Sequence, residues 1–534
     1  MSDLEFDVII VGAGPAGLAT AWQLSRHSRP LKIAVLEKSA RVGGHLLSGA
    51  LLDPADLHPL DLPDAPPLGP KVTRESLRLF SRQHAFPLPS LWSHQGCHLL
   101  SLGPFCRWLA ACCEKSGVEI YPGFVASRLL WDHTRLCGVI TGDQGLNLQG
   151  HPQPGHQPGV TLRAPITILA EGCRGHLTRE AIERLHLDRD RPPQTYGLGF
   201  KELWEIPPRS PTHTGEILHT LGWPLQADHY GGGFLYAMAP DRLSLGWVTG
   251  LDYRDAAFDP FLAFQHWKSH PRIRSRLLGG RPLAFGAKTL VEGGWQALPQ
   301  LIFDGGMLVG DGAGFLDAAR LQGIGNAFHS GVAAAAAVIE AFAGRDFSAQ
   351  GLRGYPERIQ RSAWFGALKA VRNVRPGFRW GRIPGLLNAA WEWSCRGRSP
   401  WTWQWRTADR DRLRPVVTPL PSLSPRPEAS PWILDRPAAL ALSALTHRED
   451  QPIHLRLRDP RAPLEAGLRF DNPETRYCPA GVYEIKRPPA VPEPIYRMHA
   501  AQCLHCKCCD IKDPLDNIRW TPPEGGSGPD FGEM

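Results

Sequence analysis

Phe6-Asp-Val-Ile-Ile-Val11, followed by Gly12-Ala-Gly14-Pro-Ala-Gly17, decides the fold of the N-terminal part of the chain. The apolar, β-branched run predicts a buried parallel strand. Leu18–Leu24 after the glycines predicts a helix, and Leu31–Leu36 predicts a second strand that ends at Glu37. Together these segments form one βαβ unit.

The three glycines have different roles in such a unit. Gly12 makes the tight turn, Gly14 lets the backbone approach a pyrophosphate, and Gly17 lets the helix pack on the strand. Free backbone N–H groups at the start of the helix can then donate hydrogen bonds to the phosphates. Glu37 stands where an acid binds the ribose hydroxyls. A glycine-rich turn without a cofactor is the weaker alternative, because the helix, the second strand and the acid all follow in order.

Three further segments favour FAD over NAD. Glu37-Lys38 with Gly43-Gly44, the stretch Thr167–Gly172, and Gly310–Phe315 resemble the cofactor-binding motifs of two-domain flavoproteins. The last contains a Gly-Asp pair whose acid would bind the ribityl chain; a solvated turn is the alternative. The predicted cofactor-binding residues are therefore Gly12, Gly14, Gly17, Glu37, Gly44, Glu171, Gly172, Asp311 and Gly312.

Composition excludes several classes of protein. The 534 residues are 43% hydrophobic and 21% charged, which is ordinary globular composition. A net charge of +7 without a Lys/Arg block gives no sign of nucleic-acid binding. No window holds about 18 consecutive apolar residues, so we expect no transmembrane helix. Met1–Asp7 does not read as a signal or transit peptide, so we expect the chain to start in the cytoplasm.

Five of the twelve cysteines lie near the C-terminus. Cys503, Cys506 and Cys509 follow x₂ spacing, and Cys478-Pro479 lies upstream. Three close thiolates and one distant partner favour a [4Fe–4S] cluster. Structural Zn²⁺ is the alternative, although it more often uses two separate Cys pairs. Cys508 breaks the spacing, and we expect it to take no part.

The rest of the chain divides by pattern. Strands are expected at Val118–Tyr121, Val160–Leu169, Tyr196–Trp204, Leu243–Val248 and Gly305–Gly310, and helices at Gly325–Phe342 and Leu352–Arg375. Residues 46–70 read as an irregular loop. Residues 376–406 hold six Trp among many Arg, and proline is dense in residues 413–431. A Trp/Arg-rich segment suits a membrane interface, with a core role as the alternative.

At this point the sequence resembles the electron-transfer flavoprotein:ubiquinone oxidoreductase family over most of its length. The resembling segments include His45–Ala50, Lys201–Trp204, Gly222–Leu225, Tyr230–Tyr236, Trp267–Pro271, Cys478–Glu484, Cys503–Pro514 and Pro523–Gly526. One departure is Arg320–Asn326, where the family usually carries a Lys-Gly-Thr-His-like run. It falls near the expected flavin ring, so the flavin potential and the acceptor do not follow from the resemblance alone.

The resemblance implies FAD, a [4Fe–4S] cluster and ubiquinone as acceptor, on a monotopic protein at the cytoplasmic face of the inner membrane. By position, the cluster ligands would be Cys478, Cys503, Cys506 and Cys509, and the quinone would contact Tyr230, Gly231 and Gly232. A glycine pair lets a flat ring approach the backbone; a β-bulge or turn is the alternative.

The expected architecture is α/β and α+β with several domains. A Rossmann-like FAD domain would comprise residues 1–185, with a membrane-facing loop at 46–70, and residues 299–375. An antiparallel-sheet quinone domain would span residues 186–298. The Trp/Arg-rich interfacial segment and proline-rich linker would span residues 376–431, and a ferredoxin-like [4Fe–4S] domain residues 432–534.

The expected function is transfer of electrons from reduced electron-transfer flavoprotein to ubiquinone, with membrane lipid as a further partner. No side-chain nucleophile or base is expected, because cofactor positioning supplies the catalysis and water can supply the quinone's protons. A fused FixC/FixX-like subunit of a larger flavoprotein complex, an isoprenoid-lipid reductase, a non-enzymatic iron–sulfur carrier and a Zn-stapled adaptor stay open as alternatives.

Overall fold

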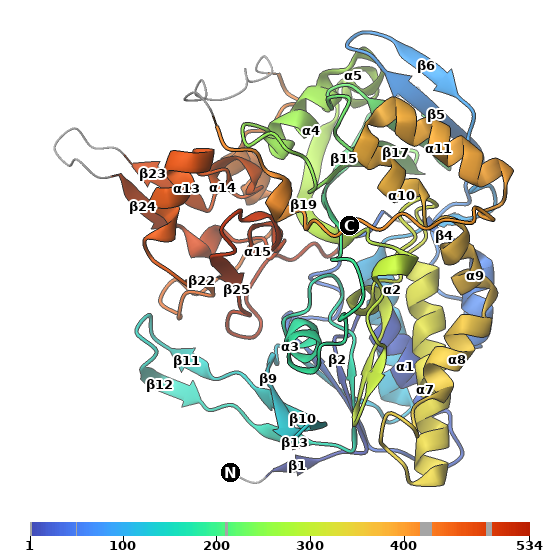
Figure 1. The fold of residues 1–534 in the computed structure, drawn as a ribbon, viewed down its shortest axis with the longest axis vertical. Coiled ribbons are helices and arrows are strands. Elements are labelled where there is room, and N and C mark those ends of the chain that lie inside the picture. The colour runs from blue at the N-terminus through green and yellow to red at the C-terminus, as the bar shows by residue number, and fades with distance from the viewer. Residues whose placement is uncertain (1–2, 50, 209–211, 417–429, 487–493) are drawn as a thin grey trace.

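The computed structural model describes residues 3–49, 51–208, 212–416, 430–486 and 494–534, and two large sheets organise it (Figure 1). The first has six strands in the order β20-β21-β14-β2-β3-β8. These strands are Ile302–Phe303, Gly306–Leu308, Ile166–Leu169, Val8–Val11, Ile33–Glu37 and Glu119–Pro122. All pairs are parallel except β20 with β21, as the βαβ pattern predicts.

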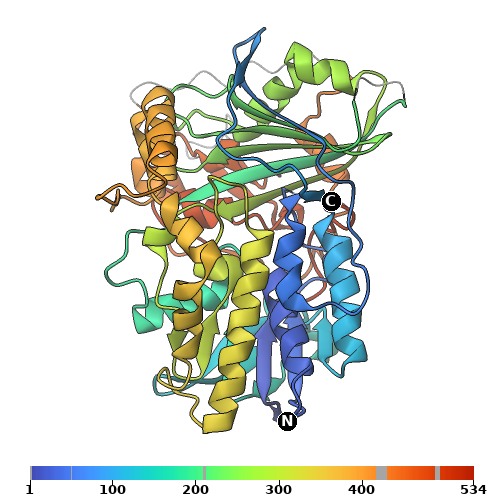
Figure 2. The same ribbon diagram turned by 90° about the vertical axis from the view of Figure 1, so that its right-hand side faces the viewer.

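Helices α1 (Pro15–Ser25), α2 (Leu102–Lys115), α3 (His176–Leu185) and α7 (Ile324–Gly344) accompany this sheet. Helices α1 and α7 run side by side (Figure 2). They approach closely at Gly331, where a Cβ atom would lie 2.4 Å from the carbonyl oxygen of Ala16. Among the described residues, α7 is one helix long and apolar enough to cross a membrane, with 50% of its apolar window buried. Its packing on α1 identifies it as a core helix.

Smaller sheets extend the N-terminal part. Strands β1 (Leu4–Glu5), β13 (Thr161–Arg163), β10 (Arg135–Thr141) and β9 (Ala126–Asp132) form a four-stranded sheet in that order. The hairpin β11 (Gln144–Leu146) and β12 (Pro152–Gln157) projects toward the C-terminal part (Figure 1). Strands β4 (Leu51–Leu52) and β7 (His98–Leu99) pair, and a 3₁₀ helix spans Pro54–Leu60, so residues 46–70, which we expected to be an irregular loop, contain short regular elements.

The second large sheet has seven strands in the order β19-β15-β18-β17-β16-β5-β6. They are Arg281–Val291, Tyr196–Glu205, Arg242–Gly250, Gly231–Ala239, Glu216–Gly222, Arg74–Phe80 and Ala85–Leu88. All neighbours are antiparallel except β16 with β5. Strands β5 and β6 therefore join this sheet from a distant part of the sequence. Helices α4 (Pro260–Ser269) and α5 (Pro271–Leu277) precede β19.

The segment expected to be one helix at Leu352–Arg375 is three helices. They are α8 (Gly354–Arg361), α9 (Ala363–Ala370) and α10 (Val374–Gly377). Ser362 separates the first two, because its backbone is extended and its hydroxyl accepts the N–H of Phe365 as an N-cap. Helix α6 (Gly310–Ala313) precedes α7, and α11 (Arg382–Ser394) carries part of the Trp/Arg-rich segment.

The C-terminal part covers the β19 edge of the seven-stranded sheet (Figure 1). It contains helices α12 (Arg436–Ala441), α13 (Ala462–Phe470), α14 (Glu474–Tyr477) and α15 (Cys508–Lys512). Strands β22 (Leu455–Leu457) and β25 (Ile518–Trp520) pair, as do β23 (Tyr483–Lys486) and β24 (Ile495–Met498). Most of the proline-dense stretch predicted as a linker, residues 417–429, lies outside the described residues.

Candidate functional site: two adjoining cavities

One cavity of about 490 Å³ joins the two large sheets. At one end it is lined by Gly12, Gly14 and Glu37 of the parallel sheet, and at the other by the glycines that begin β17. Most of its wall is apolar, with a few polar groups from distant parts of the chain. Such a site suits a large planar cofactor and a second apolar ligand.

Two of the three glycines in the turn leave no room for a side chain. Gly12 has a φ of +108°, and a Cβ atom there would lie 2.4 Å from the carbonyl oxygen of Ala170. A Cβ atom on Gly17 would lie 2.0 Å from the carbonyl oxygen of Gly12. Gly14 is the extended N-cap residue of α1 and has no such clash. Gly12 and Gly14 line the cavity, whereas Gly17 supports the turn from behind.

Glu37 stands at the end of β3, where a ribose acid is expected. Its carboxylate accepts the Ala13 N–H at 3.0 Å and the Ser39 N–H at 2.9 Å. These bonds hold the carboxylate beside the glycine turn. Because Glu37 also lines the cavity, the fold brings together the phosphate-binding and ribose-binding elements that the sequence predicts.

Glu171 and Asp311 approach the same cavity from β14 and α6. Burial alone would raise the pKa of Glu171, but His176, Lys507 and the Thr178 N–H hold that pKa below its ordinary value. The carboxylate also accepts the Thr178 N–H at 2.6 Å, so it caps the start of α3. Burial raises the pKa of Asp311 to about 6, against an opposing effect of Lys288.

The predicted residues differ in how they meet the cavity. Gly172 lines it, whereas Gly44 and Gly312 do not. The carbonyl of Gly44 accepts the N–H of Phe531 at 2.7 Å, which ties this loop to the C-terminal segment. These assignments stay predictions.

The strand β17 starts with three glycines in regular register. Gly231, Gly232 and Gly233 face Thr249, Val248 and Trp247 on β18, with no shift at these positions. The segment is thus a regular strand and not a bulge. A Cβ atom on Gly232 would lie 2.0 Å from the carbonyl oxygen of Thr220 on β16. Tyr230, Gly231 and Gly232 all line the cavity.

A buried ion cluster supports Tyr230, and the sequence did not indicate it. The guanidinium of Arg375 lies 4.0 Å from the centre of the Tyr230 ring. It also donates to Asp252 at 2.9 Å and to Glu292 at 2.8 Å. These carboxylates pair with the charge of the buried Arg375 guanidinium and hold it against the Tyr230 ring. No spacing rule joins residues so far apart in the chain.

The second cavity is lined by cysteines. Cys478, Cys503, Cys506 and Cys509 line it, and Cys508 does too. All five are buried. The N–H of Val482 donates to the sulfur of Cys478 at 3.5 Å, and the N–H of His505 to that of Cys503 at 3.4 Å. Four converging thiols with N–H donors fit an iron–sulfur cluster. Position alone does not separate Cys508 from the predicted ligands.

The two cavities adjoin. Lys507 lines both of them. The hydroxyl of Thr289 on β19, which lines the first cavity, donates to the Cys506 carbonyl at 2.7 Å. One residue and one hydrogen bond therefore separate the predicted flavin and cluster sites.

Four histidines, three of them buried and His447 half-buried, cluster beside the sites, and no sequence pattern singled them out. His45, His447 and His454 all contact the ring of His505, with ring centres 5.0–5.4 Å apart. Burial lowers the pKa of each of these imidazoles. The group therefore places neutral rings next to both cavities, since His45 lines the first and His505 and His447 bond Cys503 of the second.

Family models match three regions of the chain. A model described as "Electron transfer flavoprotein-ubiquinone oxidoreductase, 4Fe-4S" matches residues 432–532. One described as "ETF-QO, ubiquinone-binding" matches residues 196–290. A third, "NAD(P)-binding Rossmann-like domain", matches residues 10–64. The first region contains the C-terminal cysteines, the second contains strands β15 to β18 and all but the last residue of β19, and the third contains the glycine turn.

Full-length relatives are similar throughout. The mitochondrial electron transfer flavoprotein-ubiquinone oxidoreductase of Homo sapiens is 38% identical over 99% of this chain and 89% of its own length. That of Arabidopsis thaliana is 40% identical over 99% of this chain and 85% of its own length. Among solved structures, a geranylgeranyl bacteriochlorophyll reductase-like protein from Thermoplasma acidophilum gives a TM-score of 0.54 at 18% identity. The match covers 74% of this chain and 89% of that one, and at this identity it shows a similar fold alone.

Proposed function

The chain belongs to the electron transfer flavoprotein-ubiquinone oxidoreductase family, and we propose which of its residues hold the cofactors and the quinone. It takes electrons from reduced electron-transfer flavoprotein and reduces ubiquinone by way of a [4Fe–4S] cluster and FAD. The contact between the two cavities through Lys507 and the Thr289–Cys506 bond carries this proposal. It gives electrons a short route from the cluster site to the flavin site.

Residues of the parallel sheet would hold FAD. The backbone of Gly12 and Gly14 and the start of α1 receive the pyrophosphate, and Glu37 receives the ribose hydroxyls. Asp311, which lines the cavity, would bond the ribityl chain, and Lys288 would place positive charge nearby. When bound, the flavin exchanges one or two electrons, which links a one-electron donor to a two-electron acceptor.

Cys478, Cys503, Cys506 and Cys509 would ligate the cluster, which supplies one-electron transfer when bound. The C-terminal part fixes these cysteines against β19 through the Thr289 bonds to Cys506. Its other groups exclude water from the site, since all four residues are buried. The chain thereby keeps the cluster dry and next to the flavin cavity.

Tyr230, Gly231 and Gly232 would form the quinone site. The glycines leave the sheet face free of side chains, so a flat ring can lie against the backbone. Arg375 holds Tyr230 at the edge of this area. Gly231 and Gly232 belong to the seven-stranded sheet and the glycine turn to the parallel sheet, so the two ligands would lie against different sheets of the same cavity.

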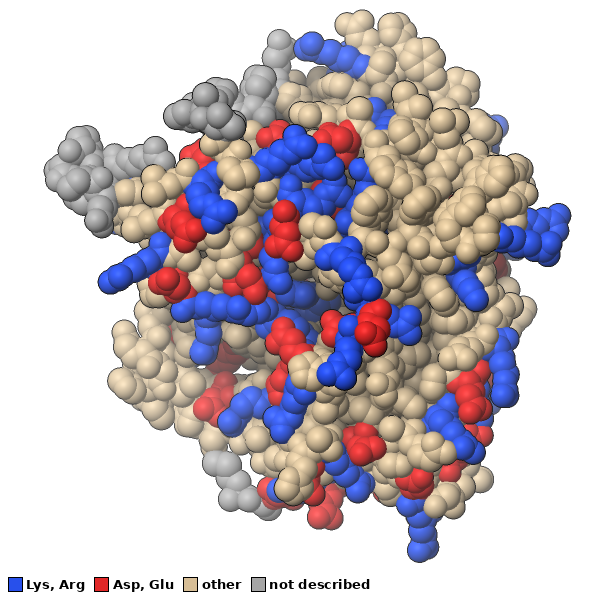
Figure 3. Space-filling view, viewed as in Figure 1, with Lys and Arg blue, Asp and Glu red and all other residues tan. Residues whose placement is uncertain are grey.

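The approach of a lipid-soluble quinone requires a membrane surface near this end. Helix α11 and the 3₁₀ turn before it expose Trp380, Ile383, Leu387 and Trp391, and the following segment exposes Trp401. Phe86 on β6 is also exposed. Both ribbon views place α11 and β6 at the same end of the molecule, and Figure 3 shows a broad area there with few charged side chains. Trp and Arg suit the headgroup boundary.

We therefore propose a monotopic protein with this apolar face in one leaflet, at the cytoplasmic face of the inner membrane. The triple variant Ile383→Ser, Leu387→Ser and Trp391→Ser should lose vesicle binding in a flotation assay. The control Leu148→Ser with Leu468→Ser changes exposed apolar residues of the β11–β12 turn and of α13, which lie away from α11 and β6 (Figure 1), and should bind as the wild type does. Equal flotation of both variants would contradict the assignment of this face.

Two cysteine variants test the function. Cys506→Ala removes a proposed ligand, and Cys508→Ala removes its buried neighbour. We expect Cys506→Ala to lose cluster iron and electron-transfer-flavoprotein-dependent quinone reduction. Cys508→Ala should keep both, as measured by iron content and anaerobic turnover. Full turnover by a Cys506→Ala protein without cluster iron would contradict the electron route.

A further inference from the structure

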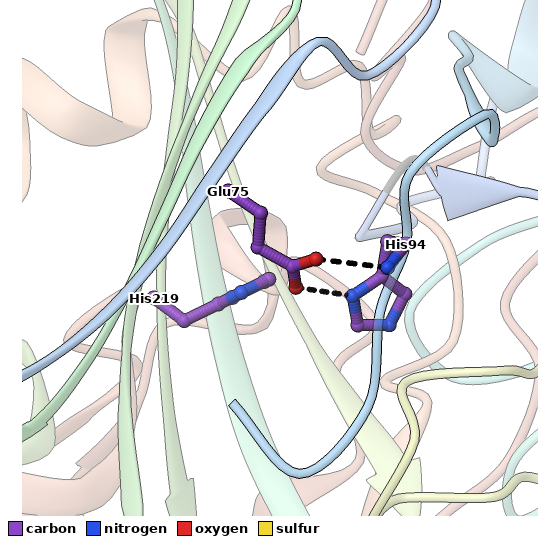
Figure 4. A group of neighbouring side chains, drawn as sticks. All are labelled: Glu75, His94 and His219. Atoms are coloured by element: carbon purple, nitrogen blue, oxygen red, sulfur yellow. Dashed lines mark hydrogen bonds and ion pairs between the residues drawn. The ribbon is translucent and has the colours of Figure 1, made fainter. Parts of the chain in front are cut away.

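Three polar side chains line the quinone end of the cavity and have no role in the electron route. Glu75 comes from β5, His94 from the loop after β6, and His219 from β16. Figure 4 shows that they converge. One ligand atom of each lies within 4.8 Å of the others. The hydroxyl of Tyr236 on β17 contacts Nε2 of His219 at 2.7 Å.

Strand register places this group beside the proposed quinone site. On β16 and β17, Ile217 faces Tyr236 and His219 faces Phe234. Gly232 lies two residues before Phe234, so its position shares a sheet face with Phe234 and Tyr236. Two residues along a strand span about 7 Å. A ring lying over Gly232 is therefore within one side-chain length of the His219 imidazole.

The hydrogen bonds of His94 require a transferable proton. Its Nε2 lies 3.0 Å from the carbonyl oxygen of Arg320, which only accepts, so Nε2 carries hydrogen. Its Nδ1 lies 2.6 Å from Oε1 of Glu75, so another hydrogen lies between them. The second Glu75 oxygen accepts the His94 backbone N–H at 2.8 Å. The pair thus holds one proton more than a carboxylate and a neutral imidazole.

The same bonds argue against a metal ion at this place. Both His94 nitrogens have hydrogen where a metal would need a lone pair. A cation would have to displace the Arg320 carbonyl or the proton shared with Glu75. The group instead forms two hydrogen-bonded pairs, Glu75–His94 and His219–Tyr236. One ligand atom from each of Glu75, His94 and His219 lies within 4.8 Å of the others, so a proton can pass from the first pair to His219 over a short distance.

The surroundings divide the group into an outer and an inner part. The side chains of Glu75 and His94 are 12% and 8% exposed, so solvent can renew their proton. Tyr236 is buried among Leu51, Val72, Cys97, Leu99 and Ile217. Burial lowers the pKa of His219 to about 3, with a smaller effect of His94, so the resting imidazole is neutral and can accept a proton.

Other charged groups near these side chains are paired or protonated. Arg320 is paired with Asp317, and His329 with Asp56. Burial, with Asp53, Asp56 and Glu75 nearby, raises the pKa of Cys97 to about 11, so it stays a thiol. Lys201, which also lines the cavity, donates to the Ser48 carbonyl at 3.0 Å.

We propose that Glu75, His94 and His219 deliver protons from solvent to the quinone, with Tyr236 orienting His219. The inference rests on the proposed quinone site. Reduction of one quinone to quinol takes two electrons and two protons, and forms two O–H bonds. The electrons come from two equivalents of one-electron-reduced flavoprotein donor. Each proton leaves the Glu75–His94 pair for His219 and then the quinone oxygen, and solvent restores it.

His219→Gln, Glu75→Gln and the milder Tyr236→Phe test this route. The control His98→Gln changes a histidine of the same region that bonds the Gly69 carbonyl at 2.8 Å and does not line the cavity. Two acceptors are compared: a short-chain ubiquinone, which takes up protons, and ferricyanide, which takes only electrons. General acid–base groups typically contribute about 10²–10⁴-fold.

We expect His219→Gln and Glu75→Gln to reduce ubiquinone at least about tenfold more slowly, with ferricyanide reduction and the KM for quinone unchanged. Their quinone rate should fall roughly tenfold per unit of rising pH, because proton supply becomes limiting. Tyr236→Phe should show a smaller loss, and His98→Gln none.

Wild-type quinone rates in these variants at all pH values would overturn the relay. Equal loss with both acceptors would also overturn it, since that indicates damage to the electron route. Stoichiometric zinc or another non-cluster metal, lost in His94→Gln, would identify a metal site instead. A wild-type protein that reduces ferricyanide but not ubiquinone would refute the quinone site itself, which separates that failure from failure of the relay.

Discussion

Gly17→Ala tests the packing that forms the flavin site. Its Cβ atom would lie 2.0 Å from the Gly12 carbonyl oxygen and 3.2 Å from Ile10. The first distance is more than 1 Å short of van der Waals contact. Overpacking of this kind costs about 3 kcal/mol when backbone must move. Replacing a helical Gly by Ala returns about 1 kcal/mol. We expect a net destabilisation of about 2 kcal/mol.

The displaced atom belongs to the turn that receives the pyrophosphate. Loss of one such contact, about 1.4 kcal/mol, weakens FAD binding roughly tenfold. Flavin content after gel filtration and the thermal transition with and without added FAD measure both effects. Gly366→Ala is the matched control, because a Cβ atom added to this exposed glycine of α9 would meet nothing within 4 Å. It should be slightly stabilised. Full flavin content and unchanged stability in Gly17→Ala would refute the packing argument.

Three other changes follow from the same structure. Gly232→Ala places a Cβ atom 2.0 Å from the Thr220 carbonyl oxygen in the wall of the proposed quinone site. Ubiquinone turnover should fall at least about tenfold while ferricyanide turnover is unchanged, and an equal loss with both acceptors would argue against the site. Burial lowers the pKa of Lys201 to about 8 from 10.5, so wild-type stability should rise between these pH values as the unfolded chain loses its extra proton. At pH 7 the Lys201→Met variant should be more stable than the wild type: removing the buried amine gains up to about 3 kcal/mol, and the lost hydrogen bond costs about 1 kcal/mol. If denaturant unfolding shows a stability difference that does not change with pH, burial of the charged amine is excluded as the cause. Glu202→Gln leaves the fully buried Lys268 without its carboxylate partner and should cost about 3–5 kcal/mol, whereas an unchanged unfolding midpoint would show that the pair is dispensable.

Local patterns predicted the parts of the fold that depend on local geometry. The strand at Val8–Val11, the helix at Pro15–Ser25 and the acid at Glu37 follow from hydrophobic runs and glycine spacing, and the structure confirms these elements. The cysteine spacing likewise brought attention to residues that do meet at one cavity. In each case the residues that act together are close in sequence or follow a fixed spacing.

Other features depend on contacts between distant segments. Strand β5 pairs in parallel with β16, and this pairing alone brings Glu75 near His219. Nothing in the alternation of either segment indicates its neighbour. The Arg375 cluster beneath Tyr230 and the histidines around His505 are assembled in the same way. Cys508 also meets the cysteine-lined cavity, although its spacing predicts otherwise, because it begins the short helix that carries Cys509.

The central claim is that this chain connects electron-transfer flavoprotein to quinone. The most direct test mixes enzymatically reduced electron-transfer flavoprotein anaerobically with a catalytic amount of the detergent-solubilised protein and a short-chain ubiquinone, and follows donor reoxidation optically. We expect rapid, complete reoxidation that requires both the protein and the quinone. Slow reoxidation, in a protein whose FAD and iron are present and chemically reducible, would contradict the claim and indicate a different donor or acceptor.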